Sequence, residues 1–215
     1  MRHHHGILYE VRVITLVAQK GGTGKTTLAI NLAVAAELAD LRTVIIDMDP
    51  QASAASWGDL REQERPVIAA VPATRLDDAI ATAQSHGADI SIIDTAPHSE
   101  GAALAAARAA DLALIPLRPG ILDLRALKAT SDICMLAGSR TAVILNQVSP
   151  RGSLADQAAT AVQDLGLKAI PHRVGARVAF NHSLTAGLGV IEYEPRGRAA
   201  EEIRKLHTWI HTEFI

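Results

Sequence analysis

A glycine-rich turn with two lysines is the part of this sequence best suited to chemistry. In VITLVAQKGGTGKTTLAINLA, residues 13–33, an apolar strand pattern leads into the turn and an amphipathic helix pattern follows it. The backbone N–H groups of such a turn and the positive end of the helix dipole together attract an anion. Lys25 is expected to reach the β- and γ-phosphates of a nucleotide, and the Thr26 hydroxyl to bind Mg²⁺. The predicted phosphate loop consists of Gly21, Gly22, Thr23, Gly24, Lys25, Thr26 and Thr27.

The second lysine of the turn, Lys20, is not explained by phosphate binding within one molecule. The usual loop pattern, GxxxxGK followed by Ser or Thr, has a glycine where this chain has Gln19, and the pair Gly21-Gly22 stands in the loop instead. One lysine is sufficient for the β- and γ-phosphates. Lys20 is therefore either a solvated loop residue or a residue with a separate task.

Three carboxylates follow apolar strand patterns. VIIDMDPQAS places Asp47 and Asp49 after one strand, and ISIIDTAP places Asp94 after another. Ligands of parallel sheets gather at the carboxyl ends of the strands, so Asp94 suits a water-mediated Mg²⁺ contact. Asp47 either supports the Mg²⁺ site or has a structural role. The alternative for any of these residues is a turn or a helix N-cap.

Strand and helix patterns alternate along the chain and must position these residues. The strand patterns cover residues 11–18, 43–47, 67–71, 90–94, 112–116, 141–146 and 168–170. The helix patterns cover residues 26–39, 53–63, 75–85, 100–109, 122–137, 154–165, 176–186 and 196–212.

The strand patterns are continuous runs of Val, Ile and Leu, which indicates burial on both faces. We therefore expect a three-layer α/β/α fold with a mostly parallel central sheet. Residues 11–215 should form a single domain, and residues 1–10, with the run His3–His5, a disordered tail. Asp123, just before a helix pattern, is interpreted as an N-cap, with a residue of a switch segment as the alternative.

The composition is that of an ordinary globular protein. Of the 215 residues, 48% are apolar and 20% charged, and the formal net charge is −2. The single cysteine, Cys134, excludes a disulfide within the chain and should be a small buried residue. No apolar run approaches the roughly 20 residues that span a bilayer. We expect a cytoplasmic protein.

Three motifs together resemble the deviant Walker A ATPases of the ParA/MinD family. They are KGGTGKTT at 20–27, DMDPQAS at 47–53 and DTAP at 94–97. The resemblance extends over residues 11–210, and it is strongest to short ParA-type partition ATPases that lack an N-terminal helix-turn-helix domain. It implies the P-loop NTPase fold and a slow ATPase that uses ATP and Mg²⁺.

The resemblance also implies roles for individual residues. Lys20 matches the signature lysine, which reaches the phosphates bound by the partner subunit of an ATP-bound homodimer. Asp49 matches the carboxylate that positions the attacking water, and Asp94 opens the second switch segment. Asn146 matches an adenine-contacting residue, and Pro195 lies in the loop that packs on the base. Since no N/TKxD motif follows Asn146, ATP is favoured over GTP.

Relatives of the ParA type bind DNA without sequence preference and have a ParB-like partner that stimulates hydrolysis. This implies association with the nucleoid in the ATP-bound state. Arg173 and Arg177 would share a helix face if their helix begins early, whereas Glu201 and Glu202 dilute the other basic residues. The candidate DNA-binding residues are Arg173, Arg177, Arg196, Arg198, Arg204 and Lys205.

Two alternative functions remain open from the sequence. A MinD-like protein would use its C-terminal helix at a membrane, and Ile203, Leu206, Ile210 and Phe214 form an apolar stripe there. That helix lacks the strongly basic face of a membrane-surface helix, so docking onto the sheet is favoured. A metabolic ligase of the dethiobiotin-synthetase type would need a pocket for an acid substrate, and the sequence contains no cluster suited to one.

Overall fold

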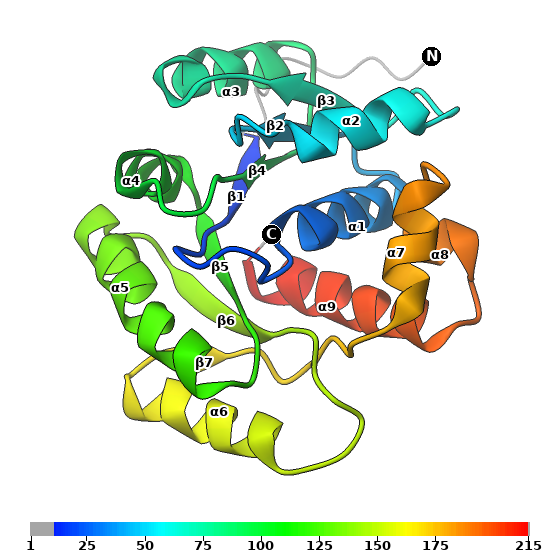
Figure 1. Cartoon of the computed structure of the whole chain (residues 1–215). Coiled ribbons are helices and arrows are strands. Elements are labelled where there is room, and N and C mark those ends of the chain that lie inside the picture. Colours follow the sequence, from blue (N-terminus) through cyan, green and yellow to red (C-terminus); the bar gives the residue numbers. More distant parts are fainter. Residues whose placement is uncertain (1–10, 215) are drawn as a thin grey trace.

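A seven-stranded parallel sheet forms the centre of the molecule (Figure 1). The computed structural model describes residues 11–214, so the expected tail at residues 1–10 lies outside the described residues. The strand order is β3-β2-β4-β1-β5-β6-β7. The strands are β1 (Arg12–Leu16), β2 (Thr43–Asp47), β3 (Val67–Ala70), β4 (Ile90–Asp94), β5 (Leu112–Leu117), β6 (Thr141–Leu145) and β7 (Lys168–Ala169).

The helices cover both faces of this sheet, which confirms the predicted three-layer fold. In Figure 1, α1, α7, α8 and α9 lie on one side and α3 to α6 on the other. The helices are α1 (Lys25–Glu37), α2 (Ser53–Leu60), α3 (Leu76–Ser85), α4 (Glu100–Ala109), α5 (Ile121–Ala137), α6 (Leu154–Asp164), α7 (Val178–Thr185), α8 (Val190–Tyr193) and α9 (Arg198–Phe214), with a 3₁₀ turn at Ala73–Arg75.

The phosphate loop lies at the point where the chain changes direction across the sheet. β1 pairs with β4 on one side and with β5 on the other. The chain goes from β1 outward to β2 and β3, returns to β4, and later continues on the opposite side with β5, β6 and β7. Such a switch point leaves a crevice at the carboxyl ends of the strands, and the loop after β1 opens into it.

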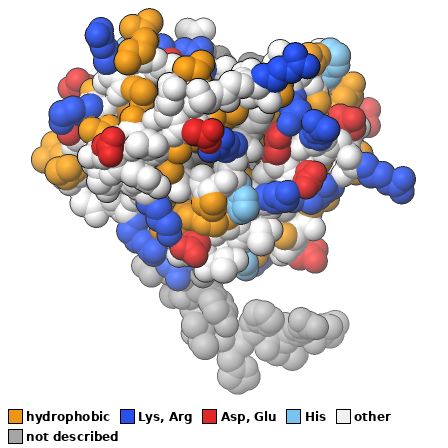
Figure 2. Space-filling model, turned by 90° about the horizontal axis from the view of Figure 1, so that it is seen from below, with side chains coloured by type: hydrophobic (Ala, Val, Ile, Leu, Met, Phe, Trp, Pro, Cys, Tyr) orange, Lys and Arg blue, Asp and Glu red, His pale blue; other side chains and the backbone are white. Residues whose placement is uncertain are grey.

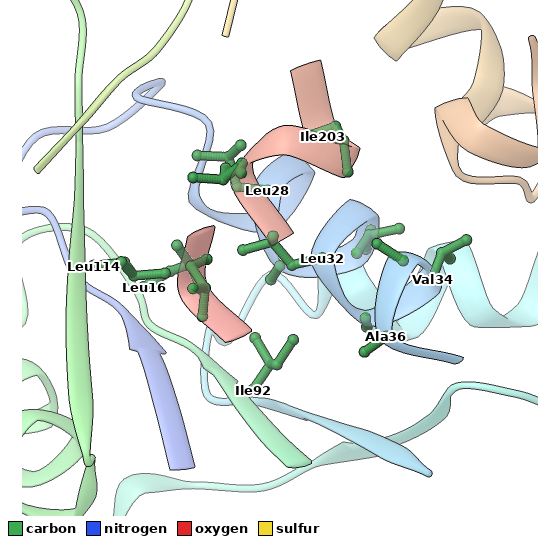
Figure 3. Packing of buried hydrophobic residues seen from close by; sticks show 14 of the residues in the cluster. Leu16, Leu28, Leu32, Val34, Ala36, Ile92, Leu114 and Ile203 are labelled. Atoms are coloured by element: carbon green, nitrogen blue, oxygen red, sulfur yellow. The ribbon is translucent and has the colours of Figure 1, made fainter. Parts of the chain in front are cut away.

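Helix α1 is buried nearly all round, whereas the sequence indicated an amphipathic helix. Ten of its thirteen residues are buried. In Figure 3, Leu28 and Leu32 lie among Leu16 of β1, Leu114 of β5 and Ile203 of α9. The sheet covers one side of α1, and α8 and α9 cover the other side, so no face of α1 has to be polar.

The C-terminal helix α9 docks on the core, as predicted. Ile203, Leu206 and Ile210 are buried in the same cluster as α1, and Phe214 packs against that cluster. Within residues 11–214, no helix has both the length and the apolar character needed to cross a membrane. The apolar stripe of α9 is therefore used inside the protein.

Several predicted boundaries are wrong by a few residues. The helix predicted at 176–186 begins at Val178, so Arg173 and Arg177 precede it and do not share a helix face. The helix predicted at 196–212 begins at Arg198 and continues to Phe214. The single turn α8 was not predicted, because four residues are too short for a periodic pattern.

Candidate functional site

The phosphate loop has a backbone that requires glycine at two positions. Gly22 and Gly24 have φ values of +72° and +92°, in the left-handed region that other residues rarely adopt. A Cβ atom at Gly24 would also lie 2.4 Å from the amide nitrogen of Asn146. The loop is held from β6, because Asn146 Nδ2 donates to the carbonyl of Thr23 at 2.7 Å and Gln147 Nε2 to that of Gly22 at 3.0 Å.

Lys25 begins α1 and has an almost fully buried side chain. Its Nζ atom donates to the carbonyl of Ala18 at 3.3 Å. Burial lowers the pKa of Lys25, and the nearby carboxylates of Asp94 and Asp49 oppose this shift. A buried ammonium at a helix N-terminus, where the first backbone N–H groups lack partners within the helix, is a site that a phosphate would stabilise.

Asp94 is fully buried at the end of β4, and neither of its carboxylate oxygens has a hydrogen-bond partner. Burial raises the pKa of Asp94 to about 7, and the negative charges of Asp47 and Asp49 add to this rise. The Thr26 hydroxyl, which lies nearby without completing a hydrogen bond, and the Lys25 ammonium act in the opposite direction. Such an orphaned carboxylate beside a hydroxyl is a fitting environment for a divalent cation.

Mg²⁺ fits the space beside Thr26 and Asp94 as an ion that takes only a few of its ligands from the protein. Among the described residues, no group of three or more His, Cys, Asp or Glu side chains could hold a metal by itself. Mg²⁺ in nucleotide sites keeps water and phosphate oxygens as most of its ligands. Thr26 and Asp94 would supply the protein's share, and the ion would neutralise charge on the phosphates.

Asp47 was predicted to be either a residue of the Mg²⁺ site or a structural residue. Its hydrogen bonds to backbone N–H groups fit the structural role. Its Oδ1 accepts from the N–H of Asp49 at 3.0 Å, and its Oδ2 from those of Ala54 at 2.9 Å and Ala55 at 3.1 Å. It therefore caps the start of α2, where the N-cap residue Ala52 has no side chain to do so. Asp49 on this anchored segment is half-buried, and its charge opposes the lowering of the pKa of Lys25 and adds to the rise of the pKa of Asp94.

A cavity of about 390 Å³ lies beside the phosphate loop. Asn146 lines it and Pro195 does not, and the base contact of Asn146 stays a prediction. Pro195 lies in the exposed loop between α8 and α9, so its position does not support the predicted packing on the base. The residues lining the cavity are Gly24, Thr27, Asn146, Gln147, Gly175, Ala176, Arg177, Val178, Phe180 and Asn181.

Nothing in the sequence indicates that residues 175–181 belong to this cavity. They carry no motif, and they reach the loop only because the chain after β7 returns across the carboxyl edge of the sheet, where Val148 and Gly175 form an isolated bridge. Arg177, predicted as a DNA contact, lines this cavity and pairs with Glu202, which also accepts from the N–H of Gly175 at 3.1 Å. The bond to Glu202 raises the pKa of Arg177.

Lys20 forms an ion pair that the sequence analysis did not predict. Its Nζ lies 2.7 Å from Oδ2 of Asp123, and Nε of Arg118 lies 3.0 Å from Oδ1 of the same carboxylate. The interpretation of Asp123 as an N-cap is wrong. Gly120 occupies that position, and Asp123 is the third residue of α5, where its side chain turns to Lys20 and Arg118.

Most of the predicted DNA-binding residues already have partners on the protein. On the face seen in Figure 2, basic side chains stand in separate groups with acidic side chains among them. Arg196 and Arg198 have no hydrogen-bonded or ion-pair partner among residues 11–214. The pairs are Arg173 with Asp156, Arg177 with Glu202, Lys205 with Glu201, and Arg204 with the Pro195 carbonyl.

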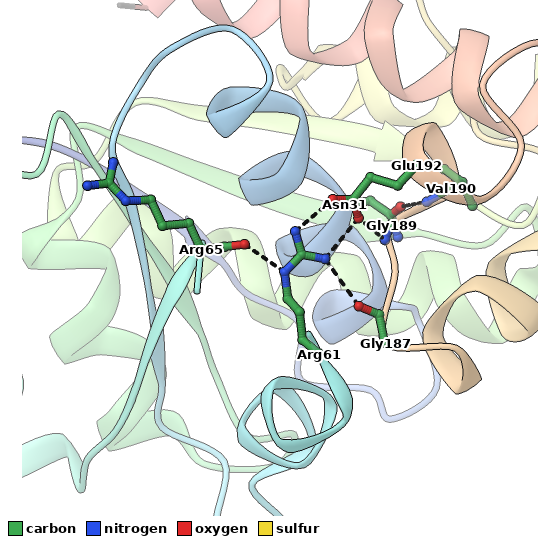
Figure 4. Close-up of polar contacts among 7 residues, drawn as sticks. All are labelled: Asn31, Arg61, Arg65, Gly187, Gly189, Val190 and Glu192. Atoms are coloured by element: carbon green, nitrogen blue, oxygen red, sulfur yellow. Dashed lines mark hydrogen bonds and ion pairs between the residues drawn. The ribbon is translucent and has the colours of Figure 1, made fainter. Parts of the chain in front are cut away.

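A mostly buried polar network lies between α1, α2 and α8 (Figure 4). The guanidinium of Arg61, after α2, donates to both carboxylate oxygens of Glu192 at 2.9 and 2.7 Å and to the carbonyl of Gly187 at 3.1 Å. Asn31 of α1 accepts from the N–H of Val190 at 2.8 Å. The network therefore joins α1, α2 and α8, and its residues had no recognised role in the sequence.

Comparison with known proteins gives one family. Residues 14–186 match the family described as the CobQ/CobB/MinD/ParA nucleotide binding domain. The matched segment includes the phosphate loop, the three carboxylates and the cavity beside Asn146.

Similar proteins and structures agree with this match. The chain is 33% identical over 203 residues to the maintenance of carboxysome distribution protein A of Gloeobacter kilaueensis, covering 89% of this chain and 88% of that protein. It is 28% identical to the protein of that name from Halothiobacillus neapolitanus, with 87% and 90% covered. The septum site-determining protein MinD of Pyrococcus horikoshii, complexed with Mg-ADP, has the same fold, with a TM-score of 0.73, 18% identity, and 93% and 96% covered.

Proposed function

Since the chain belongs to the CobQ/CobB/MinD/ParA family and is an ATPase that uses ATP and Mg²⁺, we propose that it is an ATP-dependent dimerisation switch. The ATP-bound homodimer would bind DNA without sequence preference and position a cargo, and hydrolysis would reset it. Two relatives are named for the distribution of carboxysomes, so an intracellular body is favoured as the cargo over a plasmid or a chromosome locus.

The position of Lys20 is the observation that carries this proposal. Its ammonium is directed to Asp123 at the start of α5 and makes no hydrogen bond to its own phosphate loop. In the first turn of α5, directly before Asp123, Ile121 and Leu122 are 70% and 62% exposed. An exposed apolar pair close to Lys20 in this way suits contact with a second copy of the chain. In such a dimer, Lys20 would neutralise the partner's phosphates as the interface closes.

DNA binding in this proposal depends on the dimer, because one subunit offers few unpaired basic residues among the predicted DNA contacts. Arg196 and Arg198 provide few free charges per subunit, and DNA affinity rises with every phosphate neutralised. A dimer doubles the number of contacts and so makes binding depend on ATP. A ParB-like or adaptor partner that stimulates hydrolysis would then release the protein from the nucleoid. A MinD-like membrane role is not favoured, because the apolar stripe of α9 is buried on α1.

The Lys20→Ala variant tests the proposal. It should bind ATP as a single subunit almost normally, because Lys25, Thr26 and the loop amides remain. Losing one partner of a desolvated charge pair costs roughly 2–5 kcal/mol. The ATP-dependent dimer should therefore be weakened by about 30-fold or more, as measured by light scattering at micromolar protein with a non-hydrolysable ATP analogue, and ATP-dependent DNA binding should fall with it.

Lys128→Ala is the matched control, since Lys128 is exposed on α5 and, within residues 11–214, its side chain pairs only with Asp132. It should dimerise like the parent. If Lys20→Ala also dimerises like the parent, Lys20 is an ordinary loop lysine and the dimer switch is wrong.

The Asp49→Ala variant separates hydrolysis from binding. It should still bind ATP with Mg²⁺ and dimerise, because Asp49 positions water and does not hold the nucleotide. Removal of a group that positions or activates the attacking water should slow hydrolysis by roughly 100-fold or more. Phosphate release and dimer lifetime are the measurements. Normal turnover, or a protein that stays monomeric with ATP, contradicts this role.

A further inference from the structure

We propose that Asp123 holds Lys20 in the single subunit, and that Arg118, which is already bound to Asp123, becomes its remaining counter-ion when Lys20 moves to the partner in the ATP-bound dimer. Asp123 and Arg118 are then positioning residues that act on dimerisation through Lys20. The inference rests on the proposed role of Lys20 in the partner's site.

The geometry of the cluster gives each cation its own oxygen. Lys20 Nζ lies 2.7 Å from Oδ2 of Asp123, and Arg118 Nε lies 3.0 Å from Oδ1. The two cations come from different segments, Lys20 from the phosphate loop and Arg118 from the segment between β5 and α5. One of them can therefore leave without disturbing the bond of the other.

Burial explains why a second cation is needed. The Asp123 side chain is only 9% exposed, whereas those of Lys20 and Arg118 are 28% and 34% exposed. A carboxylate in such a position is costly when it has no charged partner. If Lys20 were the sole partner of Asp123, its move to another subunit would leave a buried carboxylate without a counter-ion. The free-energy cost of that unpaired charge would oppose dimerisation.

Arginine is the cation suited to remain. Its planar guanidinium can bind both oxygens of one carboxylate, so Arg118 could take over Oδ2 as well as Oδ1 once Lys20 has gone. Lysine carries a compact charge on a flexible side chain, which suits Lys20 as the residue that moves from Asp123 to the partner's phosphates. Arg118 also lies over the phosphate loop, with Nη1 3.8 Å from the position that a Cβ atom of Gly22 would occupy.

In this exchange Lys20 leaves Asp123 and binds the phosphates in the partner subunit. Dimerisation therefore depends on how much negative charge those phosphates carry. A full set of ATP phosphates offers Lys20 more negative charge than one carboxylate that is already shared with Arg118. Without a γ-phosphate the exchange is less favourable, and Lys20 remains on Asp123. The cluster would thus set how strongly the dimer prefers ATP to ADP.

The test is a double-mutant cycle. The dissociation constant of the dimer is measured by sedimentation for each variant with a non-hydrolysable ATP analogue. Arg118→Gln should weaken the dimer about tenfold or more, because Asp123 is left unpaired when Lys20 leaves. Asp123→Asn should strengthen it and reduce its preference for ATP over ADP. The double variant should dimerise within about threefold of Asp123→Asn alone, since no charge is left to be stranded.

Two further variants exclude a general structural effect. Arg118→Lys keeps the charge and should retain most of the parent's dimerisation. Asp132→Asn removes an exposed carboxylate from the same helix and should change nothing. ATP binding by the single subunit is measured in Arg118→Gln as well, and the dimer constant is compared at nucleotide concentrations that saturate each variant.

The results also distinguish this inference from the proposed function. If Lys20→Ala dimerises like the parent, the role of Lys20 in trans is wrong. If Lys20→Ala fails to dimerise but Arg118→Gln behaves like the parent, only the counter-ion exchange is overturned. An Asp123→Asn variant that dimerises more weakly than the parent, or that does not rescue Arg118→Gln, overturns it as well.

Discussion

Replacing Asp94 with asparagine is expected to stabilise the nucleotide-free protein at alkaline pH and to remove its response to Mg²⁺. The pKa of Asp94 is raised from its ordinary value of 3.8 to about 7 by burial. Between these values the folded protein holds a proton that the unfolded chain has lost, so the free energy of unfolding falls as the pH rises. A shift of this size corresponds to about 4 kcal/mol, all of it lost above pH 7.

Urea unfolding at pH 4 and pH 8 measures this difference. The gain in stability of Asp94→Asn over the parent should be small at pH 4, grow as the pH rises, and level off above pH 7. Asp132→Asn, which removes an exposed carboxylate, should show no such gain. Mg²⁺ with ATP should raise the midpoint of the parent far more than that of Asp94→Asn. An Asp94→Asn protein that is less stable than the parent at pH 8 would show that the buried charge is compensated.

The Arg61→Met variant should lose roughly 3–5 kcal/mol of stability, since removing one partner of a buried ion pair leaves the other charge uncompensated. The side chain of Arg61 is 4% exposed, and it holds both oxygens of Glu192 and the carbonyl of Gly187. Methionine fills a similar volume, so the loss reflects the polar contacts. The free energy of unfolding in urea is the measurement.

Arg75→Met is the control for the buried pair. Arg75 bonds to Asp78 through the same guanidinium chemistry, but the two side chains are 68% and 71% exposed. Surface pairs contribute about 0–1 kcal/mol. Equal losses in the two variants would mean that the network joining α1, α2 and α8 does not hold these elements together.

The fold could be predicted because its signals are local. Runs such as ISIID are buried on both faces, which is typical of a parallel sheet covered by helices on both sides, and the turn before Lys25 is typical of a junction between a strand and a helix. The phosphate loop and the strand-end carboxylates are fixed by the same geometry. Those residues therefore lie where the sequence placed them.

The parts that could not be predicted depend on contacts between distant segments. Asp123 was interpreted as a cap because caps are local, whereas its partner Lys20 is 103 residues away. The cavity beside Asn146 is closed by residues 175–181, which have no motif. The predicted DNA-binding residue Arg173 is neutralised by Asp156, 17 residues earlier, and no periodicity in the sequence reveals that pairing.

The burial of α1 between the sheet and α9 has a consequence for synthesis of the chain. Helix α1 ends at Glu37, and the helix that covers its outer side begins at Arg198. At usual translation rates, the intervening stretch of roughly 160 residues takes about 10–30 s to appear. During that time the phosphate-loop helix has its apolar outer side uncovered, so the nascent chain is exposed to chaperones or aggregation until α9 emerges from the ribosome.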